Sequence, residues 1–508
     1  MSLTSGSIFL KWYHKVGSYA KQSAIVSFFL KNREYTRHSV ICNALKKLPG
    51  KEQELNQGFI RSGMNRSIEG FNNTFESFRD KNKGLLSSSA FASWLDCSKF
   101  LCFPILYFVI DYILRNYIMI DLLSSYWDEA ILIMGLCFGL FRSIFQSKGA
   151  FGKTTPMGIP IFLFILFYTA LMLMNSPDTA IGVEGVRAVT QYMLWYFVAG
   201  LLISSDEDFN RIYGWFLLMG TAFALHGIYQ FITNVPMPDH WVDMAEKGIR
   251  TRSFSIIGSP NILGSAMTLL IPMSLALFFA EKKFFKKSVY LVMTGLMGLC
   301  LVFTQSRGAW IGFAIAIFAF FLIYDRRYIL PVLTAGLLVF ILVPQVYDRI
   351  VYMLSEEYIM SSLTGGRLIR WQTGVQMLSE NFLSGTGIGR FGGAVAMNHK
   401  DLFPDTYYMD NYYLKTAVEG GIFALSALAV LMVSMLRWGF GSLMNCKHPK
   451  KKLMITGMLS GLIGVIAHNL FENVFEVPAM VTWFWIIVAM MMYAGFAKSD
   501  KQGVSDNG

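Results

Sequence analysis

The chain is 508 residues long, a length that ordinarily indicates several soluble domains. Its composition excludes that organisation, because 54% of the residues are hydrophobic and only 15% are charged, against about 25% charged residues in soluble domains. The net charge of +11 is concentrated in residues 1–99, which carry 15 Lys/Arg and 7 Asp/Glu, whereas the remaining residues carry 29 and 26. A basic segment therefore precedes a nearly neutral, apolar body. This pattern indicates a polytopic membrane protein and argues against a nucleic-acid partner.

Residues 1–99 are predicted to form a basic cytoplasmic region. Residues 1–30 lack the apolar core and cleavage site of a signal peptide. Their apolar residues and lysines are spaced as expected for a helix that lies on the anionic inner leaflet of a membrane. Residues 31–98 are polar and rich in Ser, Asn, Lys and Arg, which predicts a flexible segment. Residues 498–508 are predicted to be a cytoplasmic tail.

Long apolar stretches predict membrane-spanning helices, because a helix of about 20 apolar residues crosses the hydrocarbon core. Ten uncharged stretches qualify, and 100–123 and 127–145 are weaker candidates. Within the first of these, Asp111 and Arg115 are four residues apart and could pair on one helical face. We therefore predict an all-α polytopic membrane domain over 100–497 with about twelve spans. The ten stretches are 154–177, 188–205, 212–238, 253–280, 288–306, 308–324, 328–347, 420–436, 453–471 and 477–497.

Basic residues in short loops predict the orientation, because cytoplasmic loops are enriched in Lys and Arg. The 281–287 segment holds four lysines, and 437–452 holds five basic residues and no acid. Placing both in the cytoplasm also places both termini there. Two long segments then lie outside, 234–257 and 348–410, the second being a large extracytoplasmic loop between two late helices. Its 367–381 part is predicted to form an amphipathic helix on the membrane surface.

Several motifs do not predict a metal or cofactor site. None of the six cysteines lies in a predicted outer loop, and none forms a CxxC pair, so neither a disulfide framework nor a metal site is expected. The glycines at 387, 389 and 392 match a dinucleotide-binding pattern, but no strand precedes them, which favours a turn. The acidic triplet 206–208 resembles a nucleotide-metal motif and is interpreted as the charged end of a helix.

Arginines gather on the predicted outer face. Arg250 and Arg252 end the first long loop, Arg307 lies between two uncharged runs, and Arg367 and Arg370 begin the amphipathic part of the second loop. Arg307 is expected at a tight outer turn, since a charge within hydrocarbon costs several kcal/mol. The alternative is that these arginines only anchor helix ends. Because guanidinium groups bind phosphate in a bidentate manner, a lipid-linked phosphate or diphosphate is the expected ligand.

Polar residues near the same face extend this candidate site. Asp410 could act as a general base for a hydroxyl group, or Asp410 and Asn411 could cap the helix that follows; the two interpretations are compatible. Lys415 and Glu419 have the i,i+4 spacing of an intramembrane ion pair. His468, at the outer end of a span, is expected to face the same cavity or to hydrogen-bond between helices.

Five segments in this order resemble the O-antigen ligase/polymerase superfamily of membrane glycosyltransferases, over roughly residues 184–497. They are 252–261 (RSFSIIGSPN), 304–310 (TQSRGAW), 366–371 (GRLIRW), 385–391 (GTGIGRF) and 410–421 (DNYYLKTAVEGG). The resemblance implies about a dozen helices, a large outer loop, and transfer of a glycan from undecaprenyl diphosphate to an acceptor hydroxyl. It also implies that neither a metal nor a nucleotide cofactor is needed, because the diphosphate is already an activated leaving group.

The resemblance also assigns roles to individual residues. Arg252 and Arg307 match the two arginines expected to hold the diphosphate, and Arg367 would join them; Arg250, Arg370, Asn411 and His468 are further candidates for substrate binding. Asp410 would be the base, although the ligases carry His there, and the DN sequence resembles the polymerase-like branch more closely. We therefore expect a polymerase of surface polysaccharide, with a ligase close behind.

The expected reaction is an inverting transfer without a metal at the extracytoplasmic face of a bacterial cytoplasmic membrane. The expected partners are the lipid-linked donor, a glycan or other hydroxyl acceptor, membrane lipid and envelope-assembly proteins. The alternative is a transporter or flippase for the same lipid-linked glycan. Transporters show interrupted helices at the bilayer midplane, whereas this chain concentrates arginines and long loops on one face, which favours chemistry there.

Overall fold

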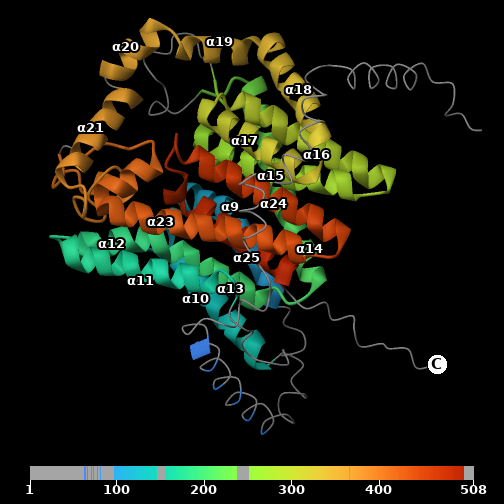
Figure 1. Cartoon of the computed structure of the whole chain (residues 1–508), viewed down its shortest axis with the longest axis horizontal. Coiled ribbons are helices and arrows are strands. Elements are labelled where there is room, and N and C mark those ends of the chain that lie inside the picture. Colours follow the sequence, from blue (N-terminus) through green and yellow to red (C-terminus); the bar gives the residue numbers. More distant parts are fainter. Residues whose placement is uncertain are drawn as a thin grey trace, which may run out of the picture. The chain divides into compact units, whose positions relative to one another are not determined.

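The computed structural model describes residues 97–145, 155–236, 251–364, 366–404 and 406–496, together with a few isolated positions between 62 and 81. Within these ranges the chain is helical and contains no strand (Figure 1). The predicted membrane-surface helix of residues 1–30, most of the segment after it, the tail 498–508 and Arg250 lie outside the described residues.

Eight helices within the described residues are long and apolar enough to cross a membrane. Two further helix pairs, each bent sharply at a short break, would raise the number to ten if each pair were one span. The eight are α10 (Asp121–Phe145), α11 (Gly158–Asn175), α14 (Asp206–Ile232), α15 (Pro260–Ala280), α16 (Phe284–Phe303), α17 (Arg307–Tyr324), α23 (Tyr412–Asn445) and α25 (Pro478–Phe496).

Two of the twelve predicted spans are helical but are not among these eight helices and two bent pairs. The 188–205 stretch is part of a chain of shorter helices, α12 (Thr179–Thr190), η4 (Gln191–Leu194) and α13 (Trp195–Leu202). The 453–471 stretch corresponds to α24 (Pro449–His468), which begins beside three lysines and is rich in glycine, so that its composition is less apolar than that of its neighbours. Twelve spans therefore remain a prediction.

The first weak span, 100–123, is a bent pair rather than a straight helix. Its two arms, Lys99–Ile105 and Tyr107–Ile118, meet at 64°. The elements are η2 (Cys97–Leu101), α8 (Cys102–Ile105), α9 (Tyr107–Ile113) and η3 (Leu114–Ile118). The predicted pair in the second arm is confirmed, with Arg115 Nε 2.9 Å from Asp111 Oδ1.

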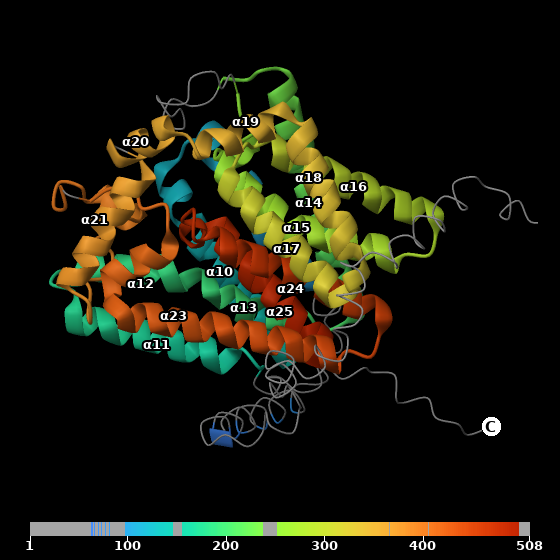
Figure 2. The same ribbon diagram turned by 45° about the horizontal axis from the view of Figure 1, so that its top comes forward.

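Glycines of α24 let this helix pack closely against α15 and α17, and the three lie together in Figures 1 and 2. A methyl group on Gly461 would overlap the backbone carbonyl of Leu269 on α15. A methyl group on Gly464 would lie 2.8 Å from the carbonyl oxygen of Gly312 on α17. Because small residues allow such backbone contact, the three helices are held side by side.

The predicted large loop, 348–410, is mostly helical. After α18 (Ile329–Leu342) the chain turns by 88° into α19 (Pro344–Met353) and continues through α20 (Glu356–Thr364) and α21 (Arg367–Glu380). Figure 2 shows these helices leading as an arch from the end of α18 towards the start of α23. The predicted helix at 367–381 is confirmed by α21. The short α22 (Ala394–Asn398) follows it.

A glycine-rich loop between α21 and α22 packs into a break in α23. Gly421 interrupts the helix with φ +66° and ψ −168°, a conformation essentially confined to glycine. The exposed backbone groups of the break are satisfied by the loop, with Thr386 N donating to Val418 O at 2.8 Å and Gly387 N donating to Glu419 O at 2.9 Å. The predicted turn at 387–392 is therefore a loop packed on α23. It follows α21, a helix, and not a strand.

Candidate active site at the ends of α15, α17 and α23

Arg252 lies in the segment that leads into α15 and is almost fully buried, with 9% of its surface exposed. Its Nε donates to the carbonyl oxygen of Thr304 at 2.9 Å. One terminal nitrogen donates to Asn261 Oδ1 at 3.1 Å. The same segment is fixed to α14, because Gln230 Oε1 accepts the backbone N–H of Ser255 at 2.6 Å. The guanidinium is thus held between α15 and the turn that precedes α17.

Arg307 is the first residue of α17 and follows a three-residue turn after α16, as the uncharged runs around it predict. Gln305 in this turn has φ +51°, a left-handed conformation that makes the reversal tight. The Arg307 guanidinium lies 4.8 Å from the ring centroid of Tyr358 on α20. Arg349 of α19, which is buried, donates to the carbonyl oxygen of Gln305 at 3.3 Å. The arch therefore covers the turn that carries Arg307.

Asp410 lies at the end of the arch segment and is 4% exposed. Arg367 of α21 forms an ion pair with its Oδ2, and Trp371 Nε1 donates to its Oδ1 at 3.1 Å. Burial alone would lower the pKa of the Arg367 guanidinium, but the Asp410 and Glu472 carboxylates outweigh this effect and raise it. Arg367 is therefore a permanent cation beside a carboxylate.

The helix cap of α23 is provided by Asn411 and not by Asp410. Asn411 Oδ1 accepts the backbone N–H groups of Tyr413 at 3.1 Å and Leu414 at 3.0 Å. Of the two roles predicted for Asp410 and Asn411, the helix cap therefore belongs to Asn411, and the role of general base remains a prediction for Asp410. The side chain of Asn411, predicted to bind substrate, stabilises the helix start, while the carboxylate of Asp410 is directed to Arg367 and Trp371.

Glu472, in the turn after α24, was not predicted as a site residue. It is 2% exposed, and its Oε2 accepts the side-chain N–H of Asn261. Its Oε1 accepts the Tyr408 hydroxyl at 2.8 Å. Asn261 also accepts a hydrogen bond from Arg252, and Tyr408 lies two residues before Asp410. Glu472 therefore connects the residues around Arg252 with the segment that carries Asp410. In the sequence, the only signal is an acid between two apolar stretches, close to His468.

His468, also predicted to bind substrate, is 1% exposed at the end of α24. Its Nδ1 shares a hydrogen bond with Ser265 Oγ of α15. A methyl group on Gly308 would lie 3.0 Å from the Nε2 atom of the same ring. His468 therefore forms a hydrogen bond between α24 and α15 and packs against the first turn of α17. The adjacent Phe471 faces Trp371, with ring centroids 6.5 Å apart.

The geometry can now be compared with known proteins. Residues 292–429 match the family model described as O-antigen ligase. This part of the chain is similar to O-antigen ligases. The resemblance predicted from the five segments is thereby confirmed, and the matched residues run from within α16 to within α23, including Arg307, Arg367 and Asp410. No curated protein matches the chain.

Close to the start of α23, a second group of buried charges surrounds Lys415. The predicted pair is confirmed, with Lys415 Nζ 2.8 Å from Glu419 Oε2. The same nitrogen lies 2.5 Å from Oε1 of Glu476 in the segment before α25. Backbone N–H groups complete the cluster, with Phe391 N donating to Glu419 Oε1 at 3.2 Å and Ala394 N to Glu476 Oε2 at 3.0 Å. The cluster thus connects α23 with the glycine-rich loop.

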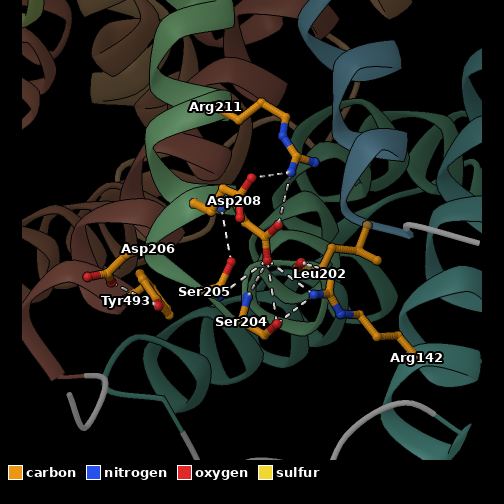
Figure 3. Close-up of polar contacts among 9 residues, drawn as sticks. Arg142, Leu202, Ser204, Ser205, Asp206, Asp208, Arg211 and Tyr493 are labelled. Carbon is orange, nitrogen blue, oxygen red and sulfur yellow. Dashed lines mark hydrogen bonds and ion pairs between the residues drawn. The ribbon is translucent and has the colours of Figure 1, made fainter. Parts of the chain in front are cut away.

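The acidic triplet lies at the end of α14 opposite to Gln230 and the Arg252 segment, and it is confirmed as the charged start of this helix. Asp208 forms a capping box with Ser205 and accepts a hydrogen bond from Arg142 at 3.1 Å (Figure 3). Arg211 lies 3.9 Å from the same carboxylate. Asp206 binds Lys451 of α24 at 2.5 Å. These contacts cross-link α10, α14 and α24, which accounts for the triplet without a nucleotide or metal.

Two predicted residues remain. Arg370 is partly buried on α21, and its backbone carbonyl accepts the Tyr407 hydroxyl at 2.5 Å. Arg250 lies outside the described residues. In the part of the chain that the structure describes, no group of three or more His, Cys, Asp or Glu could hold a metal.

Proposed function

We propose that this protein transfers a glycan from undecaprenyl diphosphate to an acceptor hydroxyl in the assembly of a surface polysaccharide, with a polymerase favoured over a ligase. The O-antigen ligase match supports transfer of a lipid-linked glycan. The observation that carries the assignment is the buried Asp410–Arg367 pair, because it lies within a group of arginines at the ends of two spanning helices.

In the proposed reaction, the acceptor oxygen attacks the anomeric carbon while the bond from that carbon to the diphosphate oxygen breaks, which inverts the configuration. Asp410 accepts the proton of the acceptor hydroxyl. Arg252, Arg307 and Arg367 stabilise the charge that develops on the departing undecaprenyl diphosphate. No metal or nucleotide cofactor takes part. Buried Arg349, next to the Arg307 turn, adds positive charge to the same region.

The proposed setting is the cytoplasmic membrane of a bacterium, with residues 100–497 as the transferase domain. Both termini lie in the cytoplasm, and 234–257 and 348–410 lie outside, which puts the arginine cluster at the outer face. This orientation rests on the lysines of 281–287 and 437–452. The polyprenyl chain would lie along the apolar helices that border the cluster.

The decisive experiment compares the wild-type chain with Arg307→Ala in proteoliposomes that contain undecaprenyl diphosphate-linked glycan isolated from the strain that carries the gene. Loss of Arg307 is expected to lower transfer about 10²–10³-fold, as loss of one anion-stabilising donor does. Arg327→Ala is the matched control, because Arg327 follows the far end of α17 and its side chain is 88% exposed. Equal transfer by the two variants would contradict the assignment of Arg307. Movement of the lipid without a new glycosidic bond would identify a flippase instead.

A second comparison tests the base. Asp410→Asn keeps the size of the side chain and one acceptor oxygen but cannot take up the proton, so kcat should fall by about 10²–10⁴-fold, the typical contribution of general acid–base catalysis. Near-wild-type kcat in this variant would leave Asp410 as no more than a partner of Arg367.

A further inference from the structure

Glu472 occupies an unusual position, because both of its carboxylate oxygens are used within the site. The carboxylate is buried, and burying a charge is costly unless hydrogen bonds compensate it. Asn261 of α15 donates to Oε2. The Tyr408 hydroxyl and the backbone N–H of Asn473 donate to Oε1, at 2.8 Å and 3.1 Å. The segments that carry Arg252 and Asp410 therefore meet at this single carboxylate.

The charges on either side fix the orientation of the Asn261 amide. Its N–H₂ group faces Glu472, which can only accept, and its oxygen faces Arg252, which can only donate. A flipped amide would place oxygen against the carboxylate and N–H₂ against the guanidinium, and both contacts would be repulsive. Glu472 therefore determines that Asn261 presents an acceptor to Arg252. Together with the Thr304 carbonyl, this acceptor fixes two nitrogens of the guanidinium.

The second oxygen of Glu472 holds the Asp410 side. Tyr408 lies two residues before Asp410, so its hydroxyl anchors the segment that carries the carboxylate. Although 36% of the residue is exposed, burial of its hydroxyl and the Glu472 charge raise the pKa of Tyr408 well above its ordinary value. The hydroxyl therefore remains a donor at neutral pH.

We infer that Glu472 is a positioning residue, which orients Arg252 through Asn261 and the Asp410 segment through Tyr408. This inference rests on the proposed function, since Arg252 and Asp410 matter only if they hold the donor and activate the acceptor. Glu472 touches neither substrate in this scheme. It sets the distance between the group that holds the diphosphate and the group that takes the proton.

A charge-exchange experiment tests the inference. In Glu472→Gln the amide oxygen stays on the two donors Tyr408 OH and Asn473 N–H, so that the N–H₂ group faces Asn261. Asn261 must then turn its own N–H₂ towards Arg252. Asn261→Asp places two carboxylates next to each other. Each single variant should lower transfer about 10²-fold, as displacement of a reacting group by about 1 Å does. The double variant restores the sequence of donors and acceptors. The amide introduced at position 472 can donate to the carboxylate introduced at position 261, and this carboxylate can accept from Arg252.

The readouts are transfer in proteoliposomes, the KM for the lipid-linked donor, and binding of undecaprenyl diphosphate to the full-length protein in nanodiscs. Each single variant is expected to raise the donor KM, and the double variant to recover transfer to within about tenfold of wild type. Tyr408→Phe should lower kcat more than it raises the donor KM. Its matched control is Tyr413→Phe, whose hydroxyl donates to the backbone carbonyl of Ile466 on α24 and not to Glu472.

Additive losses in the double variant, or wild-type behaviour of Glu472→Gln, would overturn the inference. A general loss of folding is separated from positioning by the double variant, because destabilisation alone would not be reversed by a second charge change. If the wild-type protein itself transfers no glycan, the proposed function fails. If wild type and Arg307→Ala behave as proposed while the exchange gives no recovery, only the role of Glu472 fails.

Discussion

Gly421→Ala should destabilise the protein strongly, because α23 and the glycine-rich loop touch at this residue. A methyl group at position 421 would overlap the carbonyl of Leu383 and lie 2.6 Å from Ser384 N, and these backbone atoms cannot rotate away. The φ of +66° and ψ of −168° add about 1–3 kcal/mol of strain for a residue with a side chain. Moving the loop breaks three hydrogen bonds, including Ile422 N to Phe382 O, each worth about 1 kcal/mol.

The combined loss is about 4 kcal/mol after the entropic gain of replacing glycine, roughly 0.4–1 kcal/mol, is subtracted. In detergent this should lower the midpoint of thermal unfolding by about 4 °C, because the unfolding entropy of a chain of this length is about 1 kcal/mol per kelvin. Transfer should fall as well, because the loop follows α21, which carries Arg367. Gly298→Ala on α16 is the matched control, since nothing lies within 4 Å of its added methyl group. Similar unfolding temperatures for the two variants would refute the steric reasoning.

Three further outcomes are expected. Lys415→Met leaves two buried carboxylates without their shared cation and should cost about 3–5 kcal/mol, seen as a lower unfolding temperature. Asn411→Ala should cost about 1 kcal/mol through loss of the helix cap. Asp410→Asn should lower the unfolding temperature as well, because it leaves the Arg367 guanidinium without its carboxylate, and should lower transfer by about 10²–10⁴-fold. The raised pKa of Tyr408 means that its folded state favours the neutral phenol. Its contribution to stability is complete below pH about 10, the unfolded pKa, and falls above it. A pH series of unfolding temperatures should therefore fall less steeply above pH 10 in Tyr408→Phe than in wild type.

Features that depend on residues close in sequence could be predicted. Arg307 was expected at a tight turn because two long uncharged runs leave it no other place, and α16 and α17 end and begin there. The Lys415–Glu419 pair follows from the geometry of one helical turn. The helix α21 follows from the pattern of 367–381. In each case the sequence spacing alone defines the geometry.

Features that depend on distant residues could not be predicted. Glu472 binds residues 211 and 64 positions away, so that its isolated carboxylate resembles an ordinary charged turn. The break at Gly421 is compensated by backbone groups of the glycine-rich loop well before it in the chain, and no hydropathy pattern records that contact. The composition of α24 is less apolar because its glycines serve contacts with α15 and α17 and not contacts with lipid.

The ion pair between Arg367 and Asp410 has a consequence for the order of the proposed reaction. The Asp410 carboxylate is bound by the Arg367 guanidinium and by the Trp371 indole N–H, so an acceptor hydroxyl must compete with them for its oxygens. A diphosphate carries more negative charge than one carboxylate and would compete for Arg367. Binding of the donor would thereby release Asp410 next to the anomeric carbon, so that a hydroxyl is activated only when donor is present. On this reasoning Asp410→Asn should bind undecaprenyl diphosphate more tightly than wild type, because no ion pair with Asp410 has to be broken before Arg367 binds the diphosphate. Its kcat should nevertheless be lower.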